Sequence, residues 1–293
     1  MSLIFPSPHG PRTVVTPTIR EAMQRIFAAH RTRGQMVVMT GKAGAGKTTA
    51  ALHIVDEVNE AANAESENSF KAEHYVATEL RRSRGDALHK RFLAEFARQV
   101  LQLTFPSDTR SIDMPALMNG IASGLRRLNI QLVFIDEAGH LPPAALDTLA
   151  TLINIVATSE AHPLTIGLVG MHDLPTNVQQ LPQVERRVTE FIHFQPLDDK
   201  TALKVLHHVD PYFRTLDVES QDGRAVMDYL LSPEVSDGGL IGLVVPLAER
   251  AASYAKNHGL EMGLLTLKTA FVLKSTDAGR ARKEMQRAWG SGK

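Results

Sequence analysis

The segment that most constrains this chain is Gly41–Thr48, GKAGAGKT, which fits the pattern G-x-x-x-x-G-K-[ST] at every fixed position. The apolar run Met36–Thr40 precedes it and a helical pattern follows it, so the segment is predicted to join a buried strand to a helix. Glycines let backbone N–H groups close around an anion there, and the amino end of a helix adds a positive partial charge. A chance glycine-rich turn is the alternative, but such a turn would not need both flanking elements. We therefore expect a loop that binds nucleotide phosphates.

The polar residues of this loop have distinct expected roles. Lys47 should reach the β- and γ-phosphates of ATP, which makes it both a binding and a catalytic residue. Thr48 should place its hydroxyl on Mg²⁺. Lys42 lies within the loop and is expected to face solvent. The predicted nucleotide-binding residues are Gly41, Lys42, Ala43, Gly44, Ala45, Gly46, Lys47, Thr48, Thr49 and Asp136.

A second motif is the apolar run Leu132–Ile135, which ends in two acids, Asp136 and Glu137. The carboxyl ends of strands are where open α/β sheets bind ligands. Asp136 is predicted to hold Mg²⁺ together with Thr48, and Glu137 to orient and deprotonate the attacking water. An exposed acidic turn is the alternative interpretation. His140, three residues further on, is interpreted as a capping residue or a partner of the acids.

The pattern along the chain predicts an α/β fold with a parallel sheet covered by helices on both faces, because apolar strands alternate with amphipathic helices. After Pro196 only helical patterns remain, which predicts a small α-helical lid domain. The predicted strands are Met36–Thr40, His74–Thr78, Leu132–Ile135, Leu164–Val169 and a weaker one within Arg186–Phe194. The predicted domains are an extended arm over 1–18, a nucleotide-binding core over 19–196, a helical lid over 197–276 and a flexible basic tail over 277–293.

Composition excludes several classes of function. The chain has no cysteine, which rules out disulfides, thiolate zinc sites and cysteine nucleophiles and fits a cytoplasmic location. The start of the sequence lacks the pattern of a signal peptide, and the longest apolar runs are too short to span a bilayer, so no membrane partner is expected. The formal net charge is +0, so any binding to DNA must use a local basic patch.

Four segments together resemble AAA+ ATPases. They are Gly41–Thr48, Leu132–Leu141 (LVFIDEAGHL), Leu164–Leu174 (LTIGLVGMHDL) and Leu181–Leu197 (LPQVERRVTEFIHFQPL). Within that class the chain is most similar to the transposition regulators called TniB or TnsC, with the B protein of phage Mu as a more distant relative. The resemblance covers roughly residues 10–275, with specific phosphate-loop and acidic motifs and softer patterns for the subfamily.

The resemblance implies an ATPase that binds ATP with Mg²⁺ and assembles with itself as a ring or helical filament on double-stranded DNA. It implies that the protein marks target DNA and works with a transposase and a target-selection adaptor protein. A neighbour's arginine would act on the γ-phosphate, and Arg187, with Arg186 beside it, occupies the matching place. The loops after the second strand would face the DNA, which singles out Arg81, Arg82 and Arg84. A solvated surface pair and a solvated basic loop are the alternatives for these arginines.

The sequence departs from the AAA+ pattern in two places. The fourth strand ends in Val169–His172 without the usual Asn, Ser or Thr, and Gly238–Gly242 lacks the usual lid arginine, with Arg250 some way beyond it. We therefore expect hydrolysis to be slow or to need a partner. Two other functions remain open. One is a switch that acts on protein partners without DNA, and the other is an origin-type loader or clamp-loader subunit, which usually carries a further domain after the lid.

Overall fold

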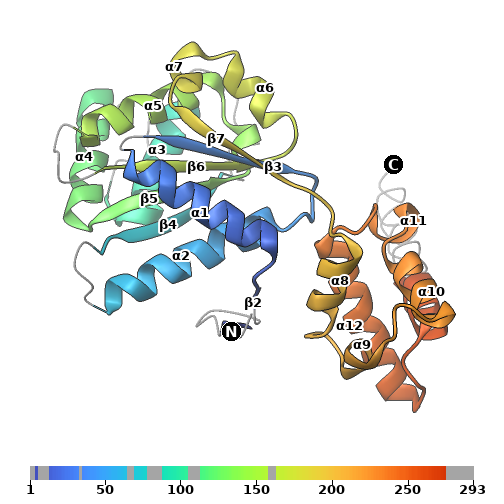
Figure 1. The fold of residues 1–293 in the computed structure, drawn as a ribbon. Coiled ribbons are helices and arrows are strands. Elements are labelled where there is room, and N and C mark those ends of the chain that lie inside the picture. Colours follow the sequence, from blue (N-terminus) through green and yellow to red (C-terminus); the bar gives the residue numbers. More distant parts are fainter. Residues whose placement is uncertain are drawn as a thin grey trace, which may run out of the picture. The chain divides into compact units, whose positions relative to one another are not determined.

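Short runs rich in valine, isoleucine and leucine form the middle of the sheet, because strands covered on both faces need apolar side chains on both. The computed structural model describes residues 4–5, 13–32, 35–64, 69–77, 88–104, 113–157 and 163–274. Five of its strands form one sheet in the order β4-β5-β6-β3-β7, and every neighbouring pair is parallel (Figure 1). These strands are β3 (Met36–Gly41), β4 (Lys71–Val76), β5 (Ile130–Asp136), β6 (Thr165–Gly170) and β7 (Val188–Phe194).

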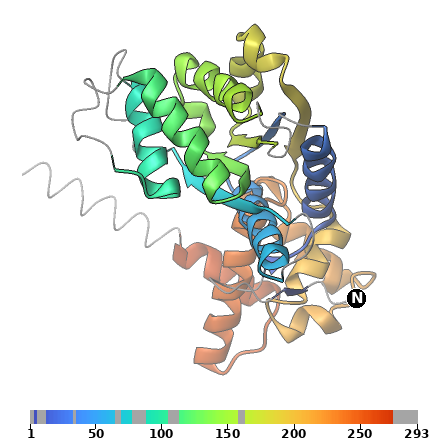
Figure 2. The same cartoon turned by 90° about the vertical axis from the view of Figure 1, so that its left-hand side faces the viewer.

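Helices cover both faces of this sheet, as predicted. On one face lie α1 (Pro17–Arg31) and α2 (Lys47–Asn63), which pack on β7, β3, β6 and β4. The other face carries α3 (Leu88–Leu101), α4 (Met114–Arg127) and α5 (Pro143–Ala157). Figure 2 shows the strands between these two helical layers. The predicted α/β fold with a parallel sheet is therefore confirmed.

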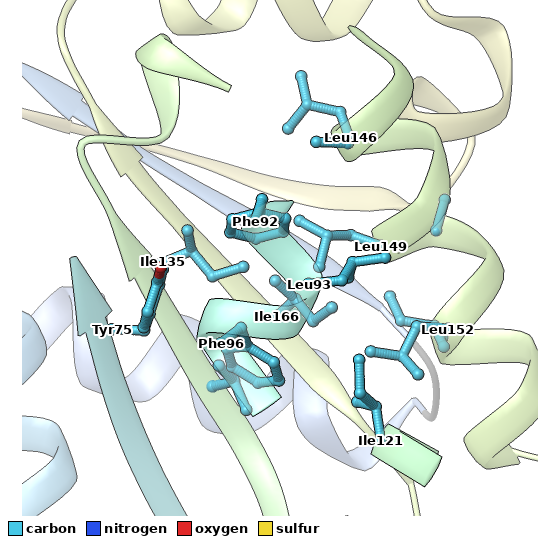
Figure 3. Close-up of a cluster of buried hydrophobic side chains, with 14 of the residues drawn as sticks. Tyr75, Phe92, Leu93, Phe96, Ile121, Ile135, Leu146, Leu149, Leu152 and Ile166 are labelled. Carbon is cyan, nitrogen blue, oxygen red and sulfur yellow. The ribbon is translucent and has the colours of Figure 1, made fainter. Parts of the chain in front are cut away.

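The main core fills the space between the sheet and the layer of α3, α4 and α5 (Figure 3). Tyr75 of β4 meets Phe92 and Phe96 of α3 edge to face, with ring centroids 5.8 and 5.6 Å apart. Ile135 and Ile166 contribute from the central strands. Aromatic pairs in this arrangement add about 0.5–1.5 kcal/mol each beyond the area that they bury. This packing holds the carboxyl ends of β4 and β5 in place.

Several helices begin at a residue whose side chain caps them. Thr16 accepts a hydrogen bond from the backbone N–H of Ile19, and Pro17 occupies the first turn of α1, where its missing N–H costs nothing. Asp113 caps α4 in the same way. Two short helices before β7, α6 (Leu174–Gln179) and α7 (Pro182–Glu185), were not predicted, because so few residues show no apolar period.

The position of β4 differs from the predicted strand His74–Thr78. The strand begins at Lys71 and ends at Val76, and Thr78 lies outside the described residues. The polar residues Lys71 and Glu73 concealed its start, since β4 is an edge strand whose side chains are only partly covered. In the observed register His74 lies opposite Phe134, close to the end of β5. Near the amino terminus, β1 (Ile4–Phe5) pairs antiparallel with β2 (Thr13–Val14).

The chain divides into two units, Met1–Phe194 and Gln195–Lys293. The described part of the second unit is entirely helical, with a core that includes Phe213, Leu230 and Val244. Its helices are α8 (Asp199–Leu206), α9 (Pro211–Thr215), α10 (Gln221–Leu230), α11 (Pro233–Ser236), α12 (Ile241–His258) and one more over 264–274. None of the helices in the described parts of the chain is long and apolar enough to cross a membrane.

Candidate nucleotide-binding site

The loop between β3 and α2 has the backbone geometry that its glycines allow. Gly44 and Gly46 have φ angles of 82° and 92°, in the left-handed region that side chains disfavour. Gly46 is also the N-cap of α2 and has no side chain to cap the helix. The first backbone N–H groups of α2 are therefore left for an anion at the carboxyl edge of the sheet.

Gly41 starts this loop for a different reason. Strand β7 runs beside β3, with Gly41 in register with Phe194. A Cβ atom on Gly41 would lie 2.4 Å from the backbone oxygen of Phe194, and its φ of 153° is also unfavourable for an L side chain. Only glycine lets the loop leave the sheet so close to β7.

Lys47 folds back over the loop. Its Nζ donates to the carbonyl oxygens of Gly41 and Lys42, at 2.8 Å each, and the residue is 8% exposed. Burial lowers the pKa of Lys47, while the negative charges of Asp136 and Glu137 act in the opposite direction. The ammonium group is thus held inside the loop, among carbonyl groups that a bound phosphate would replace as partners.

Asp136, the last residue of β5, meets the start of α2. The Thr48 hydroxyl donates to Asp136 Oδ2 at 2.6 Å, and the backbone N–H of Glu137 donates to Oδ1 at 2.8 Å. Burial by itself raises the pKa of Asp136, but hydrogen bonds from His74, Thr48 and Glu137 outweigh it and leave the pKa below its ordinary value. The carboxylate therefore stays ionised beside Thr48. A hydroxyl and a carboxylate are hard oxygen ligands of the kind that suits Mg²⁺, so the two residues fit a magnesium site.

Glu137 continues past the strand in a strained conformation. Its φ and ψ angles are 57° and 30°, which few residues other than glycine adopt. It leads into a short 3₁₀ turn, η3 (Ala138–His140), and its carboxylate lies 3.2 Å from the Nε2 of His140. The two acids have different partners, since Asp136 contacts Thr48 and Glu137 contacts His140. The sequence suggested His140 as a partner of the acids, and this contact exists.

His74 is a member of this group that sequence reasoning missed. Its Nε2 lies 3.4 Å from Asp136 Oδ2, although the two residues are far apart in sequence and on neighbouring strands. The only available signal was a histidine near the end of the strand next to β5. The misplaced start of β4 hid even that signal.

The other predicted loop residues lie around this group. Lys42, Ala43 and Thr49 are exposed, whereas Ala45 is buried. His172, after β6, is also exposed. Arg81, Arg82 and Arg84 lie outside the described residues.

Arg186 and Arg187 lie at the opposite end of the strands, where β3 begins. The N–H of Met36, at the start of β3, donates to the backbone oxygen of Arg187 at 2.7 Å. The phosphate loop begins at the far end of β3, roughly 16 Å away at 3.3 Å per residue. The Arg187 side chain donates to the Oδ1 of Asn154 on α5. Both arginines border a hollow of about 380 Å³ whose lining residues are Gln35, Ala150, Thr151, Asn154, Gln183, Arg186 and Arg187.

A glycine-rich loop from a central parallel strand into a helix, with an acid at the end of a nearby strand, defines a P-loop nucleotide-binding fold. Residues 30–178 match the family of AAA domains, and the chain belongs to that family. No curated protein matches the sequence.

Several solved structures share the fold. The ORC2 protein of Aeropyrum pernix, in ADPNP–ADP complexes, gives a TM-score of 0.60 at 18% identity, over 88% of this chain and 69% of that one. The ORC1 protein of the same organism, in complex with DNA, gives 0.61 at 15% identity, over 98% and 72%. Cdc6p from Pyrobaculum aerophilum gives 0.61 at 16% identity, over 88% and 68%. The AAA+ fold is therefore confirmed. At sequence identities this low, the likeness to these structures concerns the fold alone.

Proposed function

We propose that this chain is an ATPase that binds ATP together with Mg²⁺. The observation that carries the proposal is the contact of 2.6 Å between Thr48 and Asp136, directly beside the buried Lys47. The amino end of α2 and Lys47 would hold the phosphates, and Thr48 and Asp136 would hold the metal. When bound, Mg²⁺ neutralises charge on the phosphate oxygens. Glu137 accepts the proton of the attacking water.

The proposal includes a second copy of the chain. The phosphate loop and Arg187 lie at opposite ends of β3, so Arg187 is too far from the loop of its own chain to reach a phosphate bound there. It serves instead the γ-phosphate in a neighbouring copy, where a guanidinium stabilises the charge of the transition state. Arg186, exposed beside it, is the second candidate for this role.

The proposed biological role is regulation of DNA transposition. The protein assembles with itself on double-stranded DNA, marks the target, and recruits or activates a transposase with the help of an adaptor protein. The resemblance over residues 10–275 supports this role, and the likeness of the fold to an ORC1 protein in complex with DNA supports only the part that concerns DNA binding. Hydrolysis is slow or stimulated by a partner, because β6 ends without a polar sensor and Gly238–Gly242 contains no arginine.

Negative-stain electron microscopy tests the role directly. The full chain is mixed with double-stranded DNA and a slowly hydrolysed ATP analogue, and controls omit the nucleotide or the DNA or carry Lys47→Ala. Rings or helical filaments on DNA that need nucleotide and Lys47 support the proposal. Filaments in particular separate this role from that of an initiator or loader, which the likeness to ORC and Cdc6 structures suggests. No association with DNA in any state favours the switch that acts on protein partners.

A further inference from the structure

The surroundings of Asp136 are built by three separate segments. Its Oδ2 accepts from Thr48 at the start of α2 and faces His74 of β4 at 3.4 Å. Its Oδ1 accepts from the backbone of Glu137. The side chain of Asp136 is 8% exposed and that of His74 12%, so water has little access to this contact. The backbone contact and the threonine belong to the phosphate loop and the acidic strand end, whereas the histidine belongs to neither motif.

The register of the sheet explains how His74 reaches the site. Strands β4 and β5 are parallel, with Val76 opposite Asp136 and His74 opposite Phe134. The imidazole must extend along the strands toward their carboxyl ends to place Nε2 beside the carboxylate. Tyr75, which packs against Phe92 and Phe96, fixes the neighbouring backbone. A donor in this place restrains the rotation of the Asp136 side chain, because Nε2–H and the Thr48 hydroxyl bond to the same oxygen.

We propose that His74 is a positioning residue for magnesium, and this proposal rests on the function proposed above. The imidazole holds the Asp136 carboxylate in the orientation in which Asp136 and Thr48 receive Mg²⁺. Groups that hydrogen-bond to metal ligands typically change metal affinity by about 10- to 100-fold when they are removed. Loss of the His74 donor therefore weakens magnesium binding selectively, while nucleotide binding through the loop in the absence of metal is unchanged.

Two substitutions separate the donor from the shape of the side chain. His74→Gln and His74→Asn carry the same amide and differ by one methylene. The amide nitrogen of glutamine reaches about as far as Nε2 of the imidazole, and that of asparagine stops short. We expect His74→Asn to raise the Mg²⁺ concentration at half-maximal effect by about 10- to 100-fold, and His74→Gln to restore it almost to the wild-type value.

The measurement is equilibrium binding of a fluorescent ATP analogue to the full chain, titrated with MgCl₂ and repeated in EDTA. His30→Asn is the matched control, because the Nδ1 of His30 also lies 3.0 Å from a polar side chain, Thr165, but at the amino end of β6. That variant is expected to keep the wild-type magnesium midpoint. Thermal unfolding of each variant reports whether it is folded, and His74→Leu, which also lacks the donor, replaces His74→Asn if that variant is not.

The possible outcomes decide between the two proposals. If His74→Asn keeps the wild-type magnesium midpoint, the role of His74 is refuted while the ATPase proposal stands. If His74→Asn loses as much affinity for the ATP analogue in EDTA as in MgCl₂, the role of His74 is merely structural and the inference is also overturned. If His74→Asn does not fold, His74→Leu, which also lacks the donor, takes its place: a raised midpoint without loss of EDTA affinity supports the role, and a wild-type midpoint with wild-type stability refutes it. A wild-type protein that binds no nucleotide overturns both proposals.

Discussion

Gly41→Ala is expected to destabilise the first unit of the chain by about 1–6 kcal/mol. The added Cβ would lie 2.4 Å from the Phe194 oxygen, a backbone atom that can move only if β7 separates from β3. Overpacking of this kind costs about 1–3 kcal/mol. Backbone strain at a φ of 153° adds a similar amount, since non-glycine residues in rare conformations cost about 1–3 kcal/mol. The smaller entropy of the unfolded alanine chain returns about 0.4–1 kcal/mol.

Urea unfolding of the full chain, monitored by circular dichroism, measures the difference in the free energy of unfolding between the wild type and Gly41→Ala. The urea concentrations at half unfolding are compared, provided that the dependence of the free energy on urea is the same for both proteins. Gly139→Ala is the control, because a Cβ there meets only Asp173 at an ordinary 3.7 Å. Its effect should stay within about 1 kcal/mol. Thermal melting should show a fall of roughly 2–24 °C for Gly41→Ala. If both variants unfold at the same urea concentration, the argument from the close approach of β3 and β7 is wrong.

Four further results are expected. Glu137→Gln should keep the affinity for ATP and lower turnover by about 10²- to 10⁴-fold in a phosphate-release assay; unchanged turnover would remove Glu137 as the base. Arg187→Ala mixed with Lys47→Ala should recover part of the turnover that each lacks alone, because a mixed contact joins an intact loop to an intact arginine, and no recovery would contradict action between copies. Without DNA the wild-type turnover should stay below about one per second, and a rate well above that value would refute slow hydrolysis. The pKa of Asp136 lies below its ordinary 3.8, so its ionised form stabilises the fold fully above that pH, and this stabilisation is lost as the pH falls through the lower pKa of the folded state. Asp136→Asn should therefore flatten this part of the acid unfolding curve. An unchanged curve would exclude the contribution.

The sequence was most informative where chemistry demands particular residues at fixed spacing. The loop Gly41–Thr48 and the acidic end of β5 could be located because glycine conformation, a buried lysine and a strand-end acid leave a recognisable pattern. The parallel sheet could be predicted because its inner strands are apolar on both faces. The roles given to Lys47, Glu137 and the arginines stay predictions.

Features that depend on pairing between distant segments could not be predicted. The contact of His74 with Asp136 needs the register of β4 on β5, which a single sequence does not contain. The hydrogen bond from the Arg187 side chain to Asn154 on α5 likewise joins residues that are distant in the sequence, so the sequence alone does not predict it. The start of β4 was missed because an edge strand tolerates polar residues, and the short helices before β7 were missed because two turns or fewer show no period.

The separation of the phosphate loop and Arg187 across the sheet has a consequence for how activity would scale with assembly. If each site is completed only by the next copy, an open row of n copies contains n − 1 complete sites, and a closed ring contains n. One copy at the end of a row would bind nucleotide yet remain unable to turn it over. Specific activity would then rise with the length of a filament toward a plateau, and each break in a filament would create one more inactive end that still holds its nucleotide.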